Sequence, residues 1–433
     1  MSFFGVYSLP PVLQELQNLA DSLEEEEEGR RRPRPYVRPQ HAPFLPTRFR
    51  VFDEYLVSHD PVAFCEYTRL TPAEFEDLYV SLASKLQHVP SHAAPITGRH
   101  RLFIYMRYVS FGGTFKSLSQ ELCCGKKTVS DIVDEVTKAI SDFPPLSRPN
   151  MQSVEEIRPI SFVTFYKHAS QSMNYEATVL SADAFPPITR QMLEDCALKT
   201  HSLYDYQRAV GFLDGKHIMI KKPKHSGSLY WNYKNFNSII LLAMCDADYH
   251  ITAFDIGAPG RAGDAGVFRR SLIKRFFDRN DHLFPPNRDL DGVGEVQYHI
   301  LVDGGFGQGH RFVRPYREPM ANSGSKRRFS AKHSGARRMI ESVFGILVRR
   351  FQILQEPLKV EPKRAARIVR SILTLHSIIG IRRENIEPVI RAPPLRNAFV
   401  PLEMLAGGGG TESAKLARER IRTYYDMKYG NLP

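Results

Sequence analysis

Apolar residues between positions 48 and 142 recur with the spacing of helices. The clearest case is "TPAEFEDLYVSLASKL", where Thr71 is suited to cap a helix and Pro72 to occupy its first position. The apolar face of this helix would consist of Phe75, Leu78, Tyr79 and Leu82. The pattern predicts a compact helical domain over residues 48–142.

From residue 206 the apolar runs become shorter and typical of strands. The order is three strands, a helix and a further strand, over residues 209–220, 238–248, 250–257, 264–277 and 298–306. A long helix follows over 334–355, with an apolar stripe of Ile340, Val343, Phe344, Leu347 and Phe351. This order predicts an α/β domain with a mixed sheet over residues 206–385.

Three segments lie outside these two domains. Residues 1–47 are predicted to be a disordered tail, because "LEEEEEGRRRPRPYVRPQ" turns from acidic to basic with few apolar residues. Its "GRRRPRP" run fits either a nuclear-import signal or a solvated tail. Residues 143–205 are predicted to connect the two domains. Residues 386–433 are predicted to form a C-terminal tail, ending in a charged helix over 412–428.

Within the helical domain, "FKSLSQELCCGKKTVSDIVDEVTKAI" over 115–140 has the layout of a helix-turn-helix, with its turn at Gly125. The second helix of such a unit can enter the major groove of DNA with its first residues at the base edges. Its DNA-contact candidates are Lys126, Lys127, Thr128 and Ser130. Two helices joined by a glycine are also a common packing unit, so both interpretations remain open.

Composition narrows the class of protein. The chain has 433 residues, of which 42% are hydrophobic, so it can bury a large core. We expect an intracellular protein without a membrane span, since no apolar run approaches ~18 residues and "MSFFGVYSLP" does not resemble a signal peptide. Five cysteines without a C-x-x-C pair predict reduced, mostly buried thiols. The net charge of +12 suits a polyanionic partner.

Three carboxylates stand out against this background. "GFLDG" and "ILVDGG" each place an aspartate, Asp214 and Asp303, at the predicted end of an apolar strand. Taken alone, each Asp-Gly pair is more typical of a turn than of a site. Glu341 lies on the long helix beside its apolar stripe. Two strand-end aspartates and a helical glutamate, with basic residues nearby, are what two-metal phosphoryl transfer requires.

The chain resembles a known family, the PIF/Harbinger transposases and their domesticated relatives. The resemblance runs from about residue 65 to about residue 380 and rests on four blocks in order. These blocks are "GFLDGKHIMIKKP", "YWNYKNFNSIILLAMCDADYHITAFDIGAPGRAGDAGVF", "ILVDGGFGQGHRFVRPYRE" and "FSAKHSGARRMIESVFGILVRRFQIL".

The resemblance implies an RNase H-like DDE catalytic domain whose triad is Asp214, Asp303 and Glu341, holding Mg²⁺ or Mn²⁺, with two ions per site. Asp264 would lie near that site. The DNA-contact candidates in this domain are Lys216, Lys221, Lys222, Lys234, Arg314, Arg337 and Arg338.

The same resemblance implies a transposase that cleaves and joins DNA at transposon terminal inverted repeats and in target DNA. It implies a Myb/SANT-like partner protein, a homodimer or higher oligomer, and action in the nucleus. The alternative is a domesticated nuclear protein that acts as a nuclease or only as a DNA-binding or chromatin-interaction module.

The chain departs from the family at Ser330, where Asn is common, at His333-Ser334, where Leu-Ser is common, and at Ser377, where Asn ends a Leu-His-Asn run. None of these changes removes a metal ligand.

Several other residues have simpler explanations. Asp246 and Asp248 are expected to cap a hairpin turn. His217 should point to the opposite face of its strand from Asp214, with a structural or DNA-contact role. Tyr230, Trp231 and Tyr233, together with Lys234, suit a base-stacking surface, although buried packing would explain the aromatic residues equally well.

Overall fold

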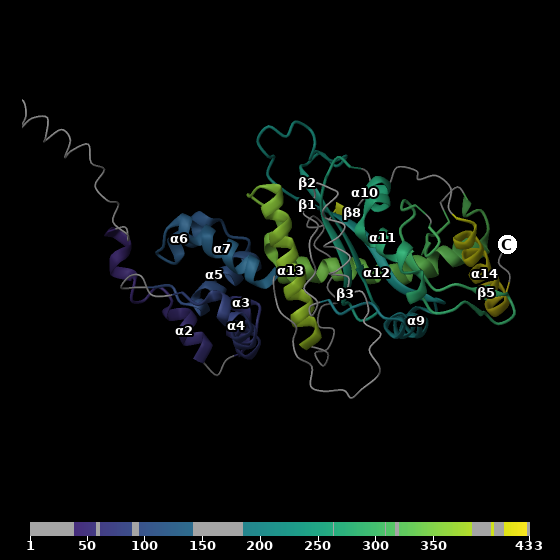
Figure 1. The fold of residues 1–433 in the computed structure, drawn as a ribbon, viewed down its shortest axis with the longest axis horizontal. Helices are drawn as coiled ribbons and strands as arrows, with labels where there is room; N and C mark the ends of the chain where they lie inside the picture. Colours follow the sequence, from purple (N-terminus) through teal and green to yellow (C-terminus); the bar gives the residue numbers. More distant parts are fainter. Residues whose placement is uncertain are drawn as a thin grey trace, which may run out of the picture.

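The fold was determined as a computed structural model (Figure 1). It describes residues 39–57, 61–88, 95–141, 185–262, 264–307, 309–316, 320–382, 400–401 and 411–430. The acidic and basic run at 23–38 and most of the connecting segment, residues 142–184, lie outside the described residues.

The first described part of the chain is helical, as its apolar spacing predicts. It contains η1 (Pro39–Phe44), α2 (Arg50–Val57), α3 (Pro61–Thr68), α4 (Pro72–Leu86), α5 (Gly98–Phe111), α6 (Phe115–Glu121) and α7 (Lys126–Ser141). The predicted start of α4 is confirmed, because Thr71 and Glu74 form a reciprocal capping box ahead of Pro72. Helices α6 and α7 occupy the predicted positions, and the apolar stripe of α7 is buried.

The second part is built on a mixed sheet. Its strands are β1 (Ala209–Met219), β2 (Ser238–Cys245), β3 (Ile251–Pro259), β6 (His299–Val302) and β7 (Phe312–Val313), in the spatial order β3-β2-β1-β6-β7. Strands β1, β2 and β3 form an antiparallel meander, whereas β6 runs parallel to β1 and to β7. A short strand, β8 (Val400–Pro401), pairs with the far end of β1.

Helices surround this sheet. They are α9 (Arg190–Tyr204), α10 (Asp264–Arg270), α11 (Leu272–Arg279), α12 (Gly324–Arg350), α13 (Pro362–Arg382) and α14 (Glu412–Tyr429), with η3 (Asp281–Leu283) and η5 (Gln352–Gln355) as short turns. Helix α12 packs across β1, β2 and β6, α9 packs on β1, and α11 and α13 pack on β3. Strands β4 (Arg288–Asp289) and β5 (Glu295–Val296) form a separate hairpin.

The structure changes several expected boundaries. The helix predicted over 264–277 is two helices, because Ser271 ends α10 and caps α11. The long helix begins at Gly324, ten positions before the predicted start at 334. Helix α9 falls within the predicted connecting segment yet packs on β1, and α14 falls within the predicted tail yet packs on α12. Both therefore belong to the α/β unit.

The helical unit and the α/β unit meet through α7 and α13, which lie side by side (Figure 1). Arg364 on α13 forms an ion pair of 2.9 Å with Asp134 and donates a 2.8 Å hydrogen bond to the Ser130 carbonyl, both on α7. A hydrogen bond of 2.5 Å joins the hydroxyls of Tyr105 and Ser371, and both residues are fully buried. One face of α7 is therefore occupied by the α/β unit.

The other class expectations concern thiols and membranes. All five cysteines are free, and Cys124, Cys196 and Cys245 are buried, as expected for reduced structural thiols. Among the helices of the described ranges, none combines the length and apolarity that a membrane crossing requires.

Candidate active site

Parallel pairing of β1 with β6 places Asp214 beside Asp303. The ladder pairs Leu213 with Val302, and each of these residues is followed by one of the two aspartates. Neighbouring strands lie about 4.8 Å apart, so the two aspartates start from adjacent backbone positions.

The prediction that both aspartates end a strand is confirmed only for Asp303. Strand β6 ends at Val302, but β1 continues to Met219, and Asp214 pairs with Ala243 of β2. Asp214 therefore lies within a strand and outside any turn. The pairing of β1 with β6 ends at Leu213, so Asp214 is the first residue of β1 beyond that ladder. This position explains how a mid-strand side chain reaches the same site as Asp303.

Helix α12 supplies the third carboxylate and a cation. Arg337 and Glu341 are one turn apart, which puts them on the same side of the helix. The Arg337 guanidinium lies 3.2 Å from Asp214, 3.6 Å from Asp303 and 2.7 Å from Glu341. The structure thus brings the three predicted triad residues together around one arginine.

Burial differs sharply across this group. The Asp214 side chain is 6% exposed and that of Arg337 is 13% exposed, whereas Asp303 and Glu341 are 37% and 42% exposed. Burial raises the pKa of Asp214, and the charges of Arg337 and Lys216 together with the Gly215 N–H oppose that rise. Burial alone would lower the pKa of Arg337, but the three carboxylates raise it.

Lys216 is part of this charge cluster. It is two residues beyond Asp214 on β1, so its side chain leaves the same face of the strand. The residue is 4% exposed, and its ammonium lies 5.5 Å from the centre of the Phe344 ring on α12. Burial lowers its pKa, while Asp214 and Glu341 act in the opposite direction. Lys216 therefore offsets carboxylate charge inside the site.

The donor set fits divalent cations. Three carboxylates are hard oxygen ligands of the kind that Mg²⁺ and Mn²⁺ take, and here they converge on a single cationic group. Their three negative charges exceed the two positive charges of Arg337 and Lys216. Asp214, Asp303 and Glu341 are the residues that would hold the ions.

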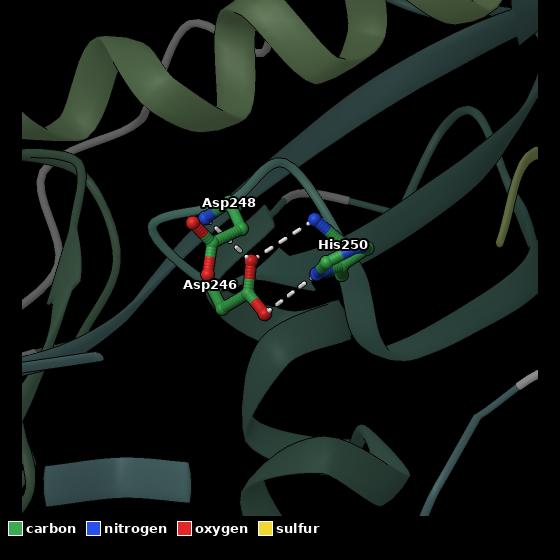
Figure 2. Close-up of side chains that lie close together, drawn as sticks. All are labelled: Asp246, Asp248 and His250. Atoms are coloured by element: carbon green, nitrogen blue, oxygen red, sulfur yellow. Dashed lines mark hydrogen bonds and ion pairs between the residues drawn. The ribbon is translucent and has the colours of Figure 1, made fainter. Parts of the chain in front are cut away.

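A second acidic group lies in the turn between β2 and β3 (Figure 2). The potential ligand atoms of Asp246, Asp248 and His250 all lie within 4.8 Å of one another, and among the described residues the triad is more widely spread than this. Asp246 Oδ1 accepts the backbone N–H groups of Asp248 at 2.8 Å and His250 at 3.0 Å. Asp248 in turn pairs with Lys199 of α9. The predicted hairpin cap is confirmed for Asp246 and not for Asp248, whose carboxylate binds Lys199, and these contacts account for the cluster.

The DNA-contact candidates divide by exposure. The exposed ones are Lys126, Lys127, Lys221, Lys222 and Arg338, and the half-buried ones are Thr128, Ser130 and Lys234. Lys216 and Arg314 are only 4% and 9% exposed, so this surface presents little of either side chain to a DNA backbone. The Arg337 guanidinium faces the triad and the side chain is 13% exposed. The DNA contacts expected of these three residues stay predictions.

Two further predicted residues can be placed. Asp264 begins α10, but its side chain lies outside the described residues. His217 is buried, and its Nδ1 lies 2.8 Å from the Ser238 hydroxyl. Burial lowers the pKa of His217 to about 4, so the ring is neutral and its role is structural.

The bridging role of Arg337 was missed at the sequence level. The available signal was its spacing of four residues from Glu341, which places a guanidinium within reach of a carboxylate on the same helix face. The register between β1 and β6, which brings the two aspartates to that guanidinium, has no signal in a single sequence.

A comparison with known families supports a class for part of the chain. A family model described as DDE superfamily endonuclease matches residues 213–377, a span that includes all three carboxylates. The match supports a DDE transposase-like nuclease domain, a class that uses divalent metals and acts on DNA. No curated protein and no solved structure gave a significant match.

Proposed function

We propose that this protein is a metal-dependent DNA transposase of the PIF/Harbinger kind, with an RNase H-like catalytic domain. The observation that carries the proposal is the convergence of Asp214, Asp303 and Glu341 on Arg337 within the span matched by the endonuclease family. The strand order supports the RNase H-like assignment, because an antiparallel meander is extended by two parallel strands.

The reaction would follow from the separate roles of these side chains. Asp214, Asp303 and Glu341 would hold the two ions, which when bound would supply activation of the attacking oxygen and stabilisation of the leaving oxygen. Water attacks a phosphodiester at a transposon end, and the freed 3′ hydroxyl then attacks target DNA. The nearby charge of Lys216 favours the ionised form of the Asp214 carboxylate and opposes the burial that raises its pKa.

The proposal extends to partners and place of action. The net charge of +12 and the exposed Lys126, Lys127, Lys221 and Lys222 suit contacts to the DNA backbone. A Myb/SANT-like protein would share recognition of the terminal inverted repeats, and the working form would be a homodimer or larger assembly in the nucleus. These assignments rest on the family resemblance of the sequence.

A domesticated protein and a transposase would share this fold and this triad. They differ in the DNA that surrounds the gene. Flanking terminal inverted repeats and a neighbouring Myb-like reading frame would favour the transposase. A single-copy locus without them would favour a host nuclease or a DNA-binding module.

The biochemical test compares wild type with Asp303→Asn on end-containing DNA, with Mg²⁺ or Mn²⁺ and the partner protein present. We expect nicking by the wild type and its loss in the variant. Asp291→Asn is the matched control, because Asp291 is exposed in the β4–β5 turn at a positive φ of 47° that Asn tolerates. If wild type and Asp303→Asn are equally inert, the catalytic proposal fails.

A further inference from the structure

The loop between β1 and β2, residues 220–237, displays aromatic side chains to solvent. Trp231 is 45% exposed, and Tyr233 and Leu229 are each 48% exposed. Figure 1 shows the loop extending beyond the ends of the two strands. Buried packing, one of the two explanations that the sequence left open, therefore does not apply to Trp231 and Tyr233.

The loop is held in shape from within. Asn232 is 2% exposed, and its side-chain oxygen accepts the N–H groups of Lys234 at 3.0 Å and Phe236 at 3.3 Å. Its amide nitrogen donates to the Ser238 hydroxyl at 2.9 Å. A β-bridge also joins Trp231 to Asn237. The aromatic residues are thus presented on a preorganised turn, which lowers the entropic cost of binding a ligand.

The charge around these rings is positive. Between Asp214 and Asp246 the chain has no acidic residue and contains Lys216, Lys221, Lys222, Lys224 and Lys234. The three lysines from 221 to 224 are exposed, as is Arg261, which hydrogen bonds to Ser228 in the loop. Glu361 is the acidic residue whose charge reaches Tyr230. Exposed aromatic rings within a basic surface suit nucleic acid better than a protein of ordinary composition.

The loop packs against β1, the strand that carries Asp214. The Tyr233 ring centre is 5.8 Å from that of His217, which is three residues beyond Asp214 and on the opposite face of the strand. The charge of Lys234 also acts on Lys216 inside the site.

We propose that Trp231 and Tyr233 form a stacking surface for unpaired bases of a single DNA strand, with the neighbouring lysines holding its phosphates. The assignment of this strand as the one being cut rests on the proposed function. The stacking itself requires no cleavage, because every base has a π-face that an aromatic ring can contact.

The chain offers a direct probe, since Trp231 is its only tryptophan. Full-length protein in EDTA is titrated with an oligothymidylate single strand and with a duplex of equal length. We expect the single strand to quench Trp231 fluorescence more strongly than the duplex. Equal binding and equal quenching by the duplex would overturn the assignment to unpaired bases.

Substitutions then separate stacking from charge, measured by the anisotropy of a labelled single strand. We expect Trp231→Ala to weaken binding about 10-fold and Trp231→Phe to retain most of it, because Phe keeps a ring. Leu229→Ala is the matched control, exposed in the same loop without a ring, and should change little. Circular dichroism and thermal melting verify that each variant is folded.

The outcomes distinguish this inference from the proposed function. If the wild type shows quenching by the single strand but no nicking, the stacking proposal is supported and the proposed nuclease function is refuted. Nicking without quenching, or equal affinity in Trp231→Ala and wild type, would remove the stacking surface. A Trp231→Ala variant that loses self-association but binds DNA normally would show that the loop contacts protein instead.

Discussion

Replacing Arg337 with glutamine should expose the electrostatic balance of the active site. The change removes the guanidinium that contacts Asp214, Asp303 and Glu341, and it leaves a polar side chain of similar reach. Asp214 would then be an almost fully buried carboxyl group without its closest cation, and the rise that burial causes in its pKa would be larger. Lys216 would be the remaining positive charge within the group.

The size of the effect comes mainly from one of the three contacts. Asp303 and Glu341 are each more than a third exposed, so water screens their part and we count little for them. The pair of Asp214 with Arg337 is buried, and breaking such a pair costs about 3 kcal/mol. For a unit of this size that corresponds to a fall of roughly 6–12 °C in the unfolding midpoint.

The assay is thermal unfolding in EDTA and in excess Mg²⁺. We expect Arg337→Gln to melt well below wild type in EDTA. Addition of Mg²⁺ should raise the melting midpoint of the variant more than that of wild type, because divalent charge replaces the lost guanidinium. Calorimetry should show tighter Mn²⁺ binding by the variant, since the competing cation is gone. Both measurements are independent of DNA cleavage.

Arg338→Gln is the matched control, because Arg338 is the next residue on α12 and is exposed. It should melt like wild type with and without Mg²⁺. If the two glutamine variants lose the same stability, or if Mg²⁺ raises their midpoints equally, the reasoning about Arg337 is refuted.

Two further predictions concern stability. Asp205 accepts hydrogen bonds from Lys332 and Lys428, which outweigh burial and lower its pKa from 3.8 to about 2. The stability that these contacts add to the fold is therefore present above pH 3.8 and is lost as the pH falls through 2. Asp205→Asn should cost at most about 2 kcal/mol near neutral pH, and the gap from wild type in urea titrations should narrow toward pH 3. A gap that is constant with pH would contradict this. Gly260→Ala should lower the melting midpoint, because its Cβ would meet the Ser238 hydroxyl and the Tyr230 carbonyl oxygen at 2.6 Å or less, whereas Gly345→Ala, with open space around it, should not. Equal midpoints would contradict the clash.

The sequence predicted the order of elements well and their partners poorly. Alternation and apolar runs located β1, β2, β3 and β6, because the period of side-chain burial is a local property. The same runs could not show that β1 continues beyond the point where β6 ends, so Asp214 was expected at a strand end. Strand pairing is long-range, and a single sequence has no record of it.

Charge was the least reliable guide to the surface. Lys216, Arg314 and Arg337 belong to basic clusters in the sequence, yet the fold turns all three inward. Lysine and arginine are rarely buried without compensation, which made exposure the natural expectation. Carboxylates from distant segments provide that compensation for Lys216 and Arg337, and only the folded chain brings them together.

The three carboxylates are positioned by different elements, because the sheet positions Asp214 and Asp303 whereas a helix carries Glu341. Asp214 and Asp303 keep their spacing as long as the ladder between β1 and β6 holds, whereas the distance to Glu341 depends on how α12 is seated. The opposite end of α12 is fastened to α14, through Ser325 to Asp426 and Arg328 to the Tyr425 carbonyl. A shift of α12 and α14 relative to the sheet would therefore move Glu341 and Arg337 together and leave the spacing of Asp214 and Asp303 unchanged.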